Sequence, residues 1–186
     1  METRVVLWKD SRFAALVMAV LIVFGSFFGA GRSLSKLKTQ TDMAFYSGVD
    51  GDGFCLQRDL DERVISATNM ITVARRYLQE DDAALSGMVN ARDVLANAKG
   101  VREKYDANVM LSSKSAELVS QLEKQDVTAQ DAVYIRSIPV DMQSRNDAMS
   151  RDGYNELAAK YNETLQGFPA KYFAATLKIE KAELFR

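Results

Sequence analysis

Residues 13–31 read FAALVMAVLIVFGSFFGAG and carry no charge between Arg12 and Arg32. As an α-helix, these 19 residues extend about 28 Å at about 1.5 Å each, which is close to the hydrocarbon thickness of a bilayer. A core helix of a soluble protein carries a polar stripe, whereas the only polar side chain in this stretch is Ser26. The stretch therefore predicts a transmembrane helix that places residues 13–31 in a lipid bilayer, after a short N-terminal flank of residues 1–12.

A cleaved signal peptide is the alternative interpretation of the same stretch. Basic residues precede the apolar run, and residues 29–31, Gly-Ala-Gly, resemble a small-x-small cleavage site. Two features favour an uncleaved anchor: the run is longer than the usual apolar core of a signal peptide, and the bulky Phe27 and Phe28 lie just ahead of the site.

The flanks of this stretch do not decide its orientation, because each carries three basic residues close to the apolar run. Gly25 and Gly29 form a G-x-x-x-G pair, which lets two membrane helices approach closely. Glycine is also frequent in membrane helices for other reasons. We therefore regard Gly25 and Gly29 as a candidate helix-dimer contact.

The remaining residues, 32–186, follow the apolar spacing of long helices. A helix leaving the membrane is expected to continue to residue 46, and the Gly- and Asp-rich residues 47–53 form the strongest loop signal. From Leu60 to Leu78, apolar residues recur in steps of four and three, which indicates a helix with one buried face.

Two further helical stretches follow along the chain. Apolar spacing indicates helix from Ala84 as far as Leu122, with Gly100 and residues 108–113 as weak points. Residues 128–131, Thr-Ala-Gln-Asp, fit a capping box and predict the start of the next helix.

That helix is expected to end near Gly167, before Pro169, and Pro139 should kink or split it. A last amphipathic helical stretch is expected over residues 172–185. No window alternates with period two for long, and helices joined by short loops bury their stripes by lying antiparallel. The predicted fold class is therefore all-α: an N-terminal transmembrane helix followed by an elongated antiparallel helical bundle over residues 32–186.

The composition argues against several kinds of chemistry. Lys and Arg number 24 against 25 Asp and Glu, so the net charge of −1 offers no field for nucleic acid. There is no histidine and one cysteine, Cys55, which removes the commonest general base and metal ligand. The loop that begins at Asp50 fails the EF-hand requirements at positions 5, 6 and 12. We expect no catalytic residues, no cofactor and no metal site.

Residues 151–169 read RDGYNELAAKYNETLQGFP. Two Tyr-Asn pairs stand seven residues apart, so they project from one helix face, and a Phe-Pro pair ends the helix. The motif consists of Tyr154, Asn155, Tyr161, Asn162, Phe168 and Pro169. We interpret it as structural rather than as a binding site, with tyrosine rings in an interhelix seam and asparagines that hydrogen-bond across helices.

This pattern resembles the LemA family of bacterial membrane proteins. The upstream order agrees, because an apolar N-terminal helix is followed by a helix of the family's kind at residues 56–60 and by the pair Ala91-Arg92. The resemblance implies a single-pass protein of the bacterial cytoplasmic (inner) membrane, with an elongated antiparallel bundle on the cytoplasmic side. It implies no molecular activity and no catalytic residues.

The sequence thus predicts a membrane-anchored, non-enzymatic helical scaffold or adaptor that meets a protein partner or a second copy of itself. The alternative is a lipid-surface or membrane-remodelling protein that acts through the cationic amphipathic tail, residues 172–186. An enzyme built on carboxylates of the bundle is the least favoured hypothesis.

Overall fold

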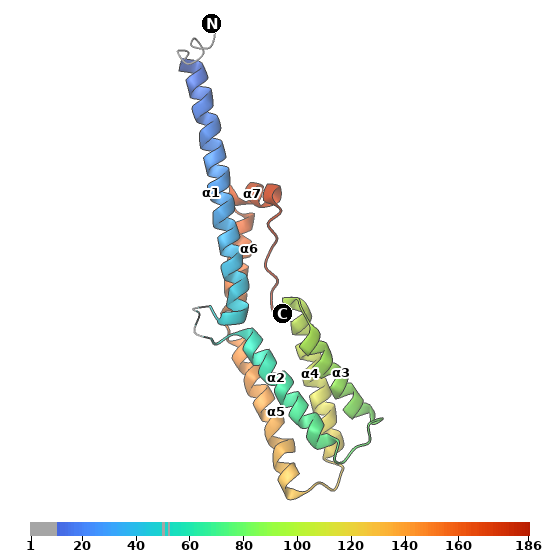
Figure 1. Cartoon of the computed structure of the whole chain (residues 1–186). Coiled ribbons are helices and arrows are strands. Elements are labelled where there is room, and N and C mark those ends of the chain that lie inside the picture. The colour runs from blue at the N-terminus through green and yellow to red at the C-terminus, as the bar shows by residue number, and fades with distance from the viewer. Residues whose placement is uncertain (1–10, 50, 52) are drawn as a thin grey trace. The chain divides into compact units, whose positions relative to one another are not determined.

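The computed structural model describes residues 11–49, 51 and 53–186. Over these residues the chain forms α-helices and no strands, which confirms the all-α fold class (Figure 1). The helices of this part of the chain are α1 (Ser11–Ser47), α2 (Leu56–Ala74), α3 (Ala83–Asn97), α4 (Val101–Leu122), α5 (Ala129–Ser150), α6 (Tyr154–Gln166) and α7 (Ala170–Leu177).

The chain divides into two compact units. One, the anchor unit, contains the chain as far as Gln40 together with Lys160–Lys181. The other, the bundle unit, contains Thr41–Ala159 together with Ala182–Arg186. Each unit therefore combines an early segment of the chain with a late one.

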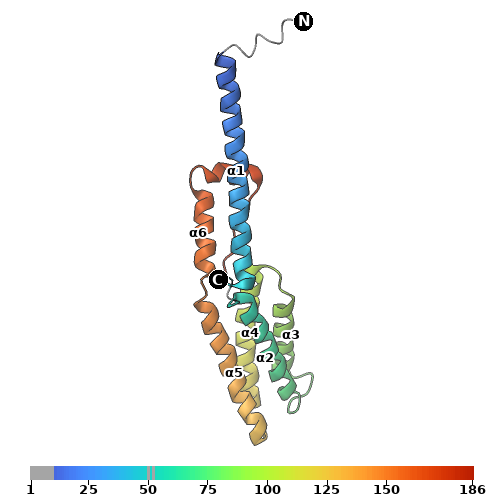
Figure 2. The same cartoon turned by 60° about the vertical axis from the view of Figure 1, so that its left-hand side comes forward.

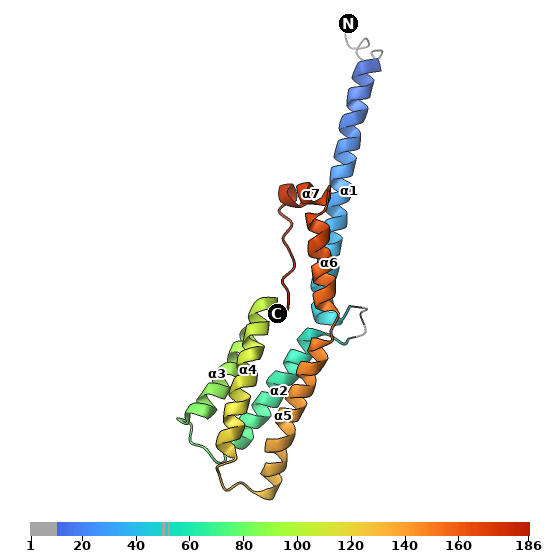
Figure 3. The same cartoon turned by 180° about the vertical axis from the view of Figure 1, so that it is seen from behind.

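In the bundle unit, α2 and α5 pack side by side and run antiparallel. Two contacts show the register, Asp59 with Arg145 and Arg63 with Met142. Arg76, just beyond the end of α2, meets Asp131 at the start of α5. The residue number rises along α2 as it falls along α5. Helices α3 and α4 form the neighbouring pair (Figure 3). The core between them is apolar and includes Leu60, Ala67, Ile71, Leu85, Met88, Leu111, Leu118 and Met142.

The stripe expected from Leu60 is buried as predicted at most of its positions, but Arg63 on the same face is buried as well. Helix α3 begins with the side chain of Asp82, which accepts hydrogen bonds from the amides of Ala84 and Leu85. The expected weak point at Gly100 is real, because it separates α3 from α4. The other expected weak point, residues 108–113, lies within unbroken α4.

The cap predicted at the start of α5 is confirmed, since Thr128 Oγ1 accepts a hydrogen bond from the amide of Asp131. The expected split at Pro139 is wrong, because α5 continues through it. Proline removes one backbone donor, and the neighbouring turns hold the helix. The helix instead breaks after Ser150, where the carboxylate of Asp152 accepts from the amide of Tyr154 and begins α6.

The C-terminal segment differs from the expected amphipathic helix over residues 172–185. Helix α6 ends at Gln166, as predicted, and α7 follows the cis Phe168–Pro169 peptide. Helix α7 ends at Leu177, where Lys178 has a positive φ of 52°. Residues 179–186, the C-terminal tail, are not helical. The amide of Ile179 donates to the carbonyl of Ala174 in α7, and backbone groups of Glu180, Glu183 and Phe185 bond to side chains of α6.

In the anchor unit, α1 contains a stretch long and apolar enough to cross a membrane, and none of that stretch is buried within the protein. Gly25 and Gly29 have open space where a Cβ would stand. Helix α7 packs against α1 (Figure 2), with the rings of Phe27 and Phe173 5.3 Å apart and Leu177 against Gly31. This contact places α7 beside the end of the apolar stretch.

Candidate functional site

In the bundle unit, the first Tyr-Asn pair of the motif holds the end of the C-terminal tail. Tyr154 Oη donates a hydrogen bond to the carbonyl of Glu183 at 2.8 Å. Asn155 Nδ2 donates to the carbonyl of Phe185 at 3.0 Å, and the amide of Phe185 donates back to Asn155 Oδ1 at 2.8 Å. The side-chain amide of Asn155 thus exchanges two hydrogen bonds with the backbone of Phe185, as a residue of a neighbouring β-strand would.

The ring of Phe185 lies in an aromatic cluster of the same unit. Its centroid is 5.3 Å from that of Tyr105 and 6.1 Å from that of Phe45, and Phe45 lies 5.4 Å from Tyr154. Edge-to-face contacts at such distances stabilise aromatic pairs by about 0.5–1.5 kcal/mol beyond burial. The tail is therefore fixed by its backbone bonds and by the ring of Phe185.

Glu183 of the tail also caps a helix. Its carboxylate accepts a hydrogen bond from the amide of Arg102, in the first turn of α4, at 3.1 Å. A carboxylate at this position satisfies a free backbone donor and opposes the positive end of the helix dipole. The N-terminus of α4 thus depends in part on a residue about eighty positions later in the chain.

The Tyr154 hydroxyl remains a donor over the whole physiological range. Burial, followed by the nearby charges of Asp42 and Glu183, raises its pKa to about 12. Tyr154 is itself buried. Its bond to the tail therefore persists until strongly alkaline pH.

In the anchor unit, the second half of the motif meets an earlier part of the tail. Tyr161 is buried, and its hydroxyl donates to the carbonyl of Glu180 at 3.1 Å. Asn162 is partly exposed, and Phe168 is almost fully exposed ahead of Pro169. The tyrosines and Asn155 therefore bind the backbone of an extended segment, where the sequence analysis expected contacts between helices.

A second polar network joins the turn that follows α2 to the start of α5. The carboxylate of Asp131 is buried and accepts hydrogen bonds from Arg76 Nη1, at 2.8 Å, and from Tyr77 Oη. The bond from Tyr77, together with that from Arg76, lowers the pKa of Asp131. Because the carboxylate is used in this way, it does not complete the capping box with Thr128.

Arg63 is the functional candidate that the sequence analysis missed. Its guanidinium is buried between α2, α4 and α5, beside a cavity of about 360 Å³. The signal was present in the spacing, because Arg63 shares a helix face with Ala67 and Met70.

The described part of the chain contains no group of three or more His, Cys, Asp or Glu residues that could hold a metal ion. Cys55, at the start of α2, is buried, and its thiol donates to the carbonyl of Tyr46. The Gly- and Asp-rich loop that fails the EF-hand pattern includes residues 50 and 52, which lie outside the described residues.

Comparison with known proteins gives one match. A family model described as LemA family matches residues 56–186 and so covers most of the chain. This match confirms the resemblance seen in the motif of α6. Neither the curated proteins nor the solved structures contain a match.

Proposed function

The chain belongs to the LemA family, and we propose that it acts as a membrane-anchored, non-enzymatic helical scaffold or adaptor. The observation that supports the anchor is the bare apolar surface of α1. Leu21, Val23 and Phe28 are 64%, 65% and 69% exposed. Burial of apolar surface is worth about 25 cal/mol per Å², so a lipid environment stabilises this helix strongly over water.

In this proposal the chain crosses the bacterial cytoplasmic (inner) membrane once, and the helical bundle lies in the cytoplasm. The cytoplasmic placement of the bundle is supported by the family resemblance alone, because equal numbers of basic residues flank the two ends of the span. Labelling of Cys55, the single thiol, is unsuitable for testing the side because this residue is buried. A cysteine at exposed Val133, in a Cys55→Ala background, is a better reporter.

The scaffold role is supported by exposed apolar residues on the bundle unit. Val133 and Val140, seven residues apart, lie on the outer face of α5, away from its buried residues, and Tyr134 is exposed beside them. Exposed apolar groups of this kind contribute to protein–protein contacts. We propose that this face meets a protein partner or a second copy of the chain, and that nucleic acid is not a partner because the net charge is −1.

The anchor is tested by separating membranes from soluble protein. Full-length chain should remain in the pellet after salt and alkaline-carbonate washes. Leu21→Arg combined with Val23→Arg should shift a large share to the supernatant, because charge at the centre of a span costs about 2.5–3.5 kcal/mol per residue. Val133→Arg with Val140→Arg is the matched control and should stay in the pellet. Recovery of unsubstituted chain in the supernatant would reject the anchor.

The scaffold is tested by measuring the mass of the complex extracted in a mild detergent. We expect a particle larger than the monomer, and Val133→Lys with Val140→Lys should reduce its mass. Gly25→Ile with Gly29→Ile separates a helix-dimer contact in the membrane from contact through α5. Recovery of free monomer alone would count against the scaffold.

A specific observation also favours the lipid-surface function. Phe168 and Tyr172 are 84% and 59% exposed, and Lys171 Nζ lies 4.9 Å from the centroid of the Tyr172 ring. Helix α7 lies beside the end of the apolar stretch of α1, where the Phe27 and Phe173 rings meet. Aromatic and cationic side chains at that level suit the headgroup region of a bilayer.

Fluorescence quenching by brominated lipids tests this placement. Phe168→Trp, in a Trp8→Phe background, should be quenched in bilayers that carry bromine near the headgroups. Tyr134→Trp, at an exposed position of α5, is the matched control and should not be quenched. Equal emission from Phe168→Trp in brominated and ordinary lipid would remove the lipid-surface function.

A further inference from the structure

Arg63 in α2 is a buried cation with incomplete hydrogen bonding. It is 1% exposed, and it donates from Nη1 to the carbonyl of Met142 at 2.5 Å and from Nη2 to Ser112 Oγ at 2.6 Å. Its Nε is buried and has no hydrogen-bond partner among the described residues. Both of its partners are uncharged, and burial lowers its pKa to about 10.

No carboxylate of the described part of the chain forms an ion pair with this guanidinium. Asp59, one turn earlier in α2, pairs with Arg145 instead, at 3.2 Å. Burying a charge without a counter-ion costs several kcal/mol, and proteins usually pair such a group. The position of Arg63 therefore favours an anion that the chain itself does not supply.

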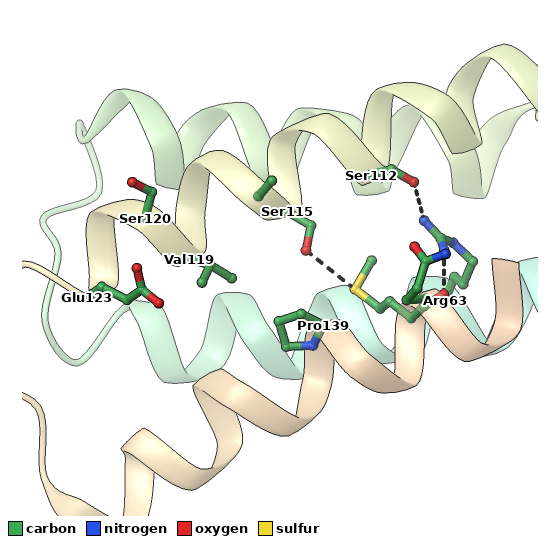
Figure 4. Close-up of a pocket in the computed structure, with 10 residues that line it drawn as sticks. Arg63, Ser112, Ser115, Val119, Ser120, Glu123 and Pro139 are labelled. Atoms are coloured by element: carbon green, nitrogen blue, oxygen red, sulfur yellow. Dashed lines mark hydrogen bonds between the residues drawn. The ribbon is translucent and has the colours of Figure 1, made fainter. Parts of the chain in front are cut away.

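A cavity of about 360 Å³ opens beside Arg63, between α4 and α5 (Figure 4). Its size falls within the range of small-molecule sites, about 300–1,000 Å³. Hydroxyls of α4 line one side, and Pro139 of α5 lies across from them. Glu123 stands at the opposite end of the cavity from Arg63.

The serines of α4 differ in how well their hydroxyls are satisfied. Ser112 accepts from Arg63 and donates to the carbonyl of Asn108 at 3.1 Å. Ser115 is buried, and its hydroxyl faces only the sulfur atoms of Met70 and Met142, at 3.6 and 3.7 Å. Thioethers are weak acceptors, so the Ser115 hydroxyl has no strong partner. It therefore gives the cavity, which the Arg63 side chain also lines, a donor that lacks a strong acceptor.

Ser120 and Gln143 add polar groups to the lining, and the apolar part of the wall is formed by Ala116, Val119, Pro139 and Met142. A ligand that suits both the Arg63 end and the apolar part of the wall has an anionic oxygen group at one end and a short hydrocarbon chain. The carboxylate of Glu123 at the far end disfavours a second negative group.

We propose that this cavity binds a small monocarboxylate with a short apolar chain. Arg63 and Ser115 hold the carboxylate, and the chain lies along Val119 and Pro139. The carboxylate supplies the counter-charge that the buried guanidinium lacks among the described residues. The site lies wholly within the bundle unit and does not depend on the membrane anchor or on a protein partner.

Equilibrium dialysis with radiolabelled hexanoate tests the proposal on the full chain in lipid nanodiscs, with empty nanodiscs subtracted. We expect saturable uptake of about one hexanoate per chain. Unlabelled hexanoate should displace it, whereas hexylamine and succinate should displace it at least tenfold less effectively. Uptake no greater than in empty nanodiscs, or displacement by hexylamine as good as by hexanoate, would overturn the proposal.

Two substitutions locate the binding. Arg63→Met should weaken hexanoate binding at least tenfold. Ala116→Trp fills the mouth of the cavity from an exposed position and leaves Arg63 in place, so it should abolish binding without unfolding the bundle. Ser113→Trp, at an exposed position of α4 outside the cavity lining, is the matched control and should bind normally. Unchanged binding by Ala116→Trp would overturn the assignment to this cavity.

Discussion

The side-chain amide of Asn155 forms two hydrogen bonds with the backbone of Phe185, thirty residues later in the chain. Both the donor and the acceptor of the asparagine are used, at 3.0 and 2.8 Å. Because Asn155 bonds to backbone atoms, these two hydrogen bonds do not depend on which side chain stands at position 185. The tail is therefore held in an extended conformation by α6, although its composition would allow a helix.

Asn155→Ala should release the end of the tail. Two hydrogen bonds of this kind contribute about 1–3 kcal/mol together, and loss of the amide leaves the Phe185 backbone groups unpaired. We expect a carboxypeptidase to remove the C-terminal residues faster. We also expect a thermal midpoint of unfolding several degrees lower. Asn97→Ala, which removes only an exposed bond to the carbonyl of Asp93, is the control and should leave both unchanged.

Tyr161→Ala should lower the thermal midpoint of the chain. Removal of a buried aromatic ring costs about 3–5 kcal/mol, and loss of its hydroxyl bond to the Glu180 carbonyl adds to this. Tyr161→Phe should cost only about 1 kcal/mol, because the ring stays in place. Tyr172→Ala, at an exposed ring, is the control. An unaltered midpoint for Tyr161→Ala would mean that the motif serves binding rather than stability.

Elements specified by neighbouring residues could be predicted from the sequence. The continuous helix from the apolar stretch to Ser47 follows from composition, and the cap at Thr128 and the end of α6 near Gly167 follow from local signals. In each case the residues that set the structure lie within a few positions of it. The family motif was recognised in the same way, from spacing within a single helix.

Features that depend on distant residues could not be predicted. The extended tail owes its conformation to Tyr154, Asn155 and Tyr161, which lie far from it in sequence. The burial of Arg63 depends on acceptors from α4 and α5, and no periodicity within α2 reveals them. The sequence carries one sign of this burial, which is a charged residue on an otherwise apolar face of the helix.

Asp131→Asn should change the acid sensitivity of the bundle. The bonds from Tyr77 and Arg76 lower the pKa of Asp131 in the folded state below its value in the unfolded state. The unfolded state therefore binds the proton more readily than the folded state. The ionised carboxylate of Asp131 stabilises the fold above about pH 4, and this stabilisation is lost as the pH falls below that value. We expect the unfolding free energy of the native chain to fall more steeply than that of Asp131→Asn between about pH 4 and pH 2.

Chemical denaturation monitored by circular dichroism across that range gives the comparison. Asp147→Asn is the control, because Asp147 is exposed and its carboxylate accepts from Gln143, one turn earlier on α5. Parallel pH profiles for the native chain and Asp131→Asn would show that the network with Arg76 contributes nothing to acid stability.

Arg63→Met should leave the ligand-free chain as stable as before or more stable. The substitution removes a desolvated charge and orphans no partner, because Ser112 still donates to the carbonyl of Asn108 and the Met142 carbonyl lies within α5. Replacement of buried charges by apolar residues of similar volume is often neutral or stabilising by about 1–4 kcal/mol. The exposed Arg58→Met on the same helix is the control and should change little.

The pH dependence of the difference in unfolding free energy between Arg63→Met and the native chain gives a further check. Burial lowers the folded-state pKa of Arg63 to about 10, so the cost of the buried cation is complete below pH 10. As the pH rises above about 10, the folded state releases the proton before the unfolded state does, and the native chain gains stability relative to Arg63→Met. The advantage of the variant should therefore shrink in urea titrations between pH 9 and pH 11. A loss of more than about 3 kcal/mol at neutral pH in Arg63→Met would identify the guanidinium as a structural tie between α2, α4 and α5.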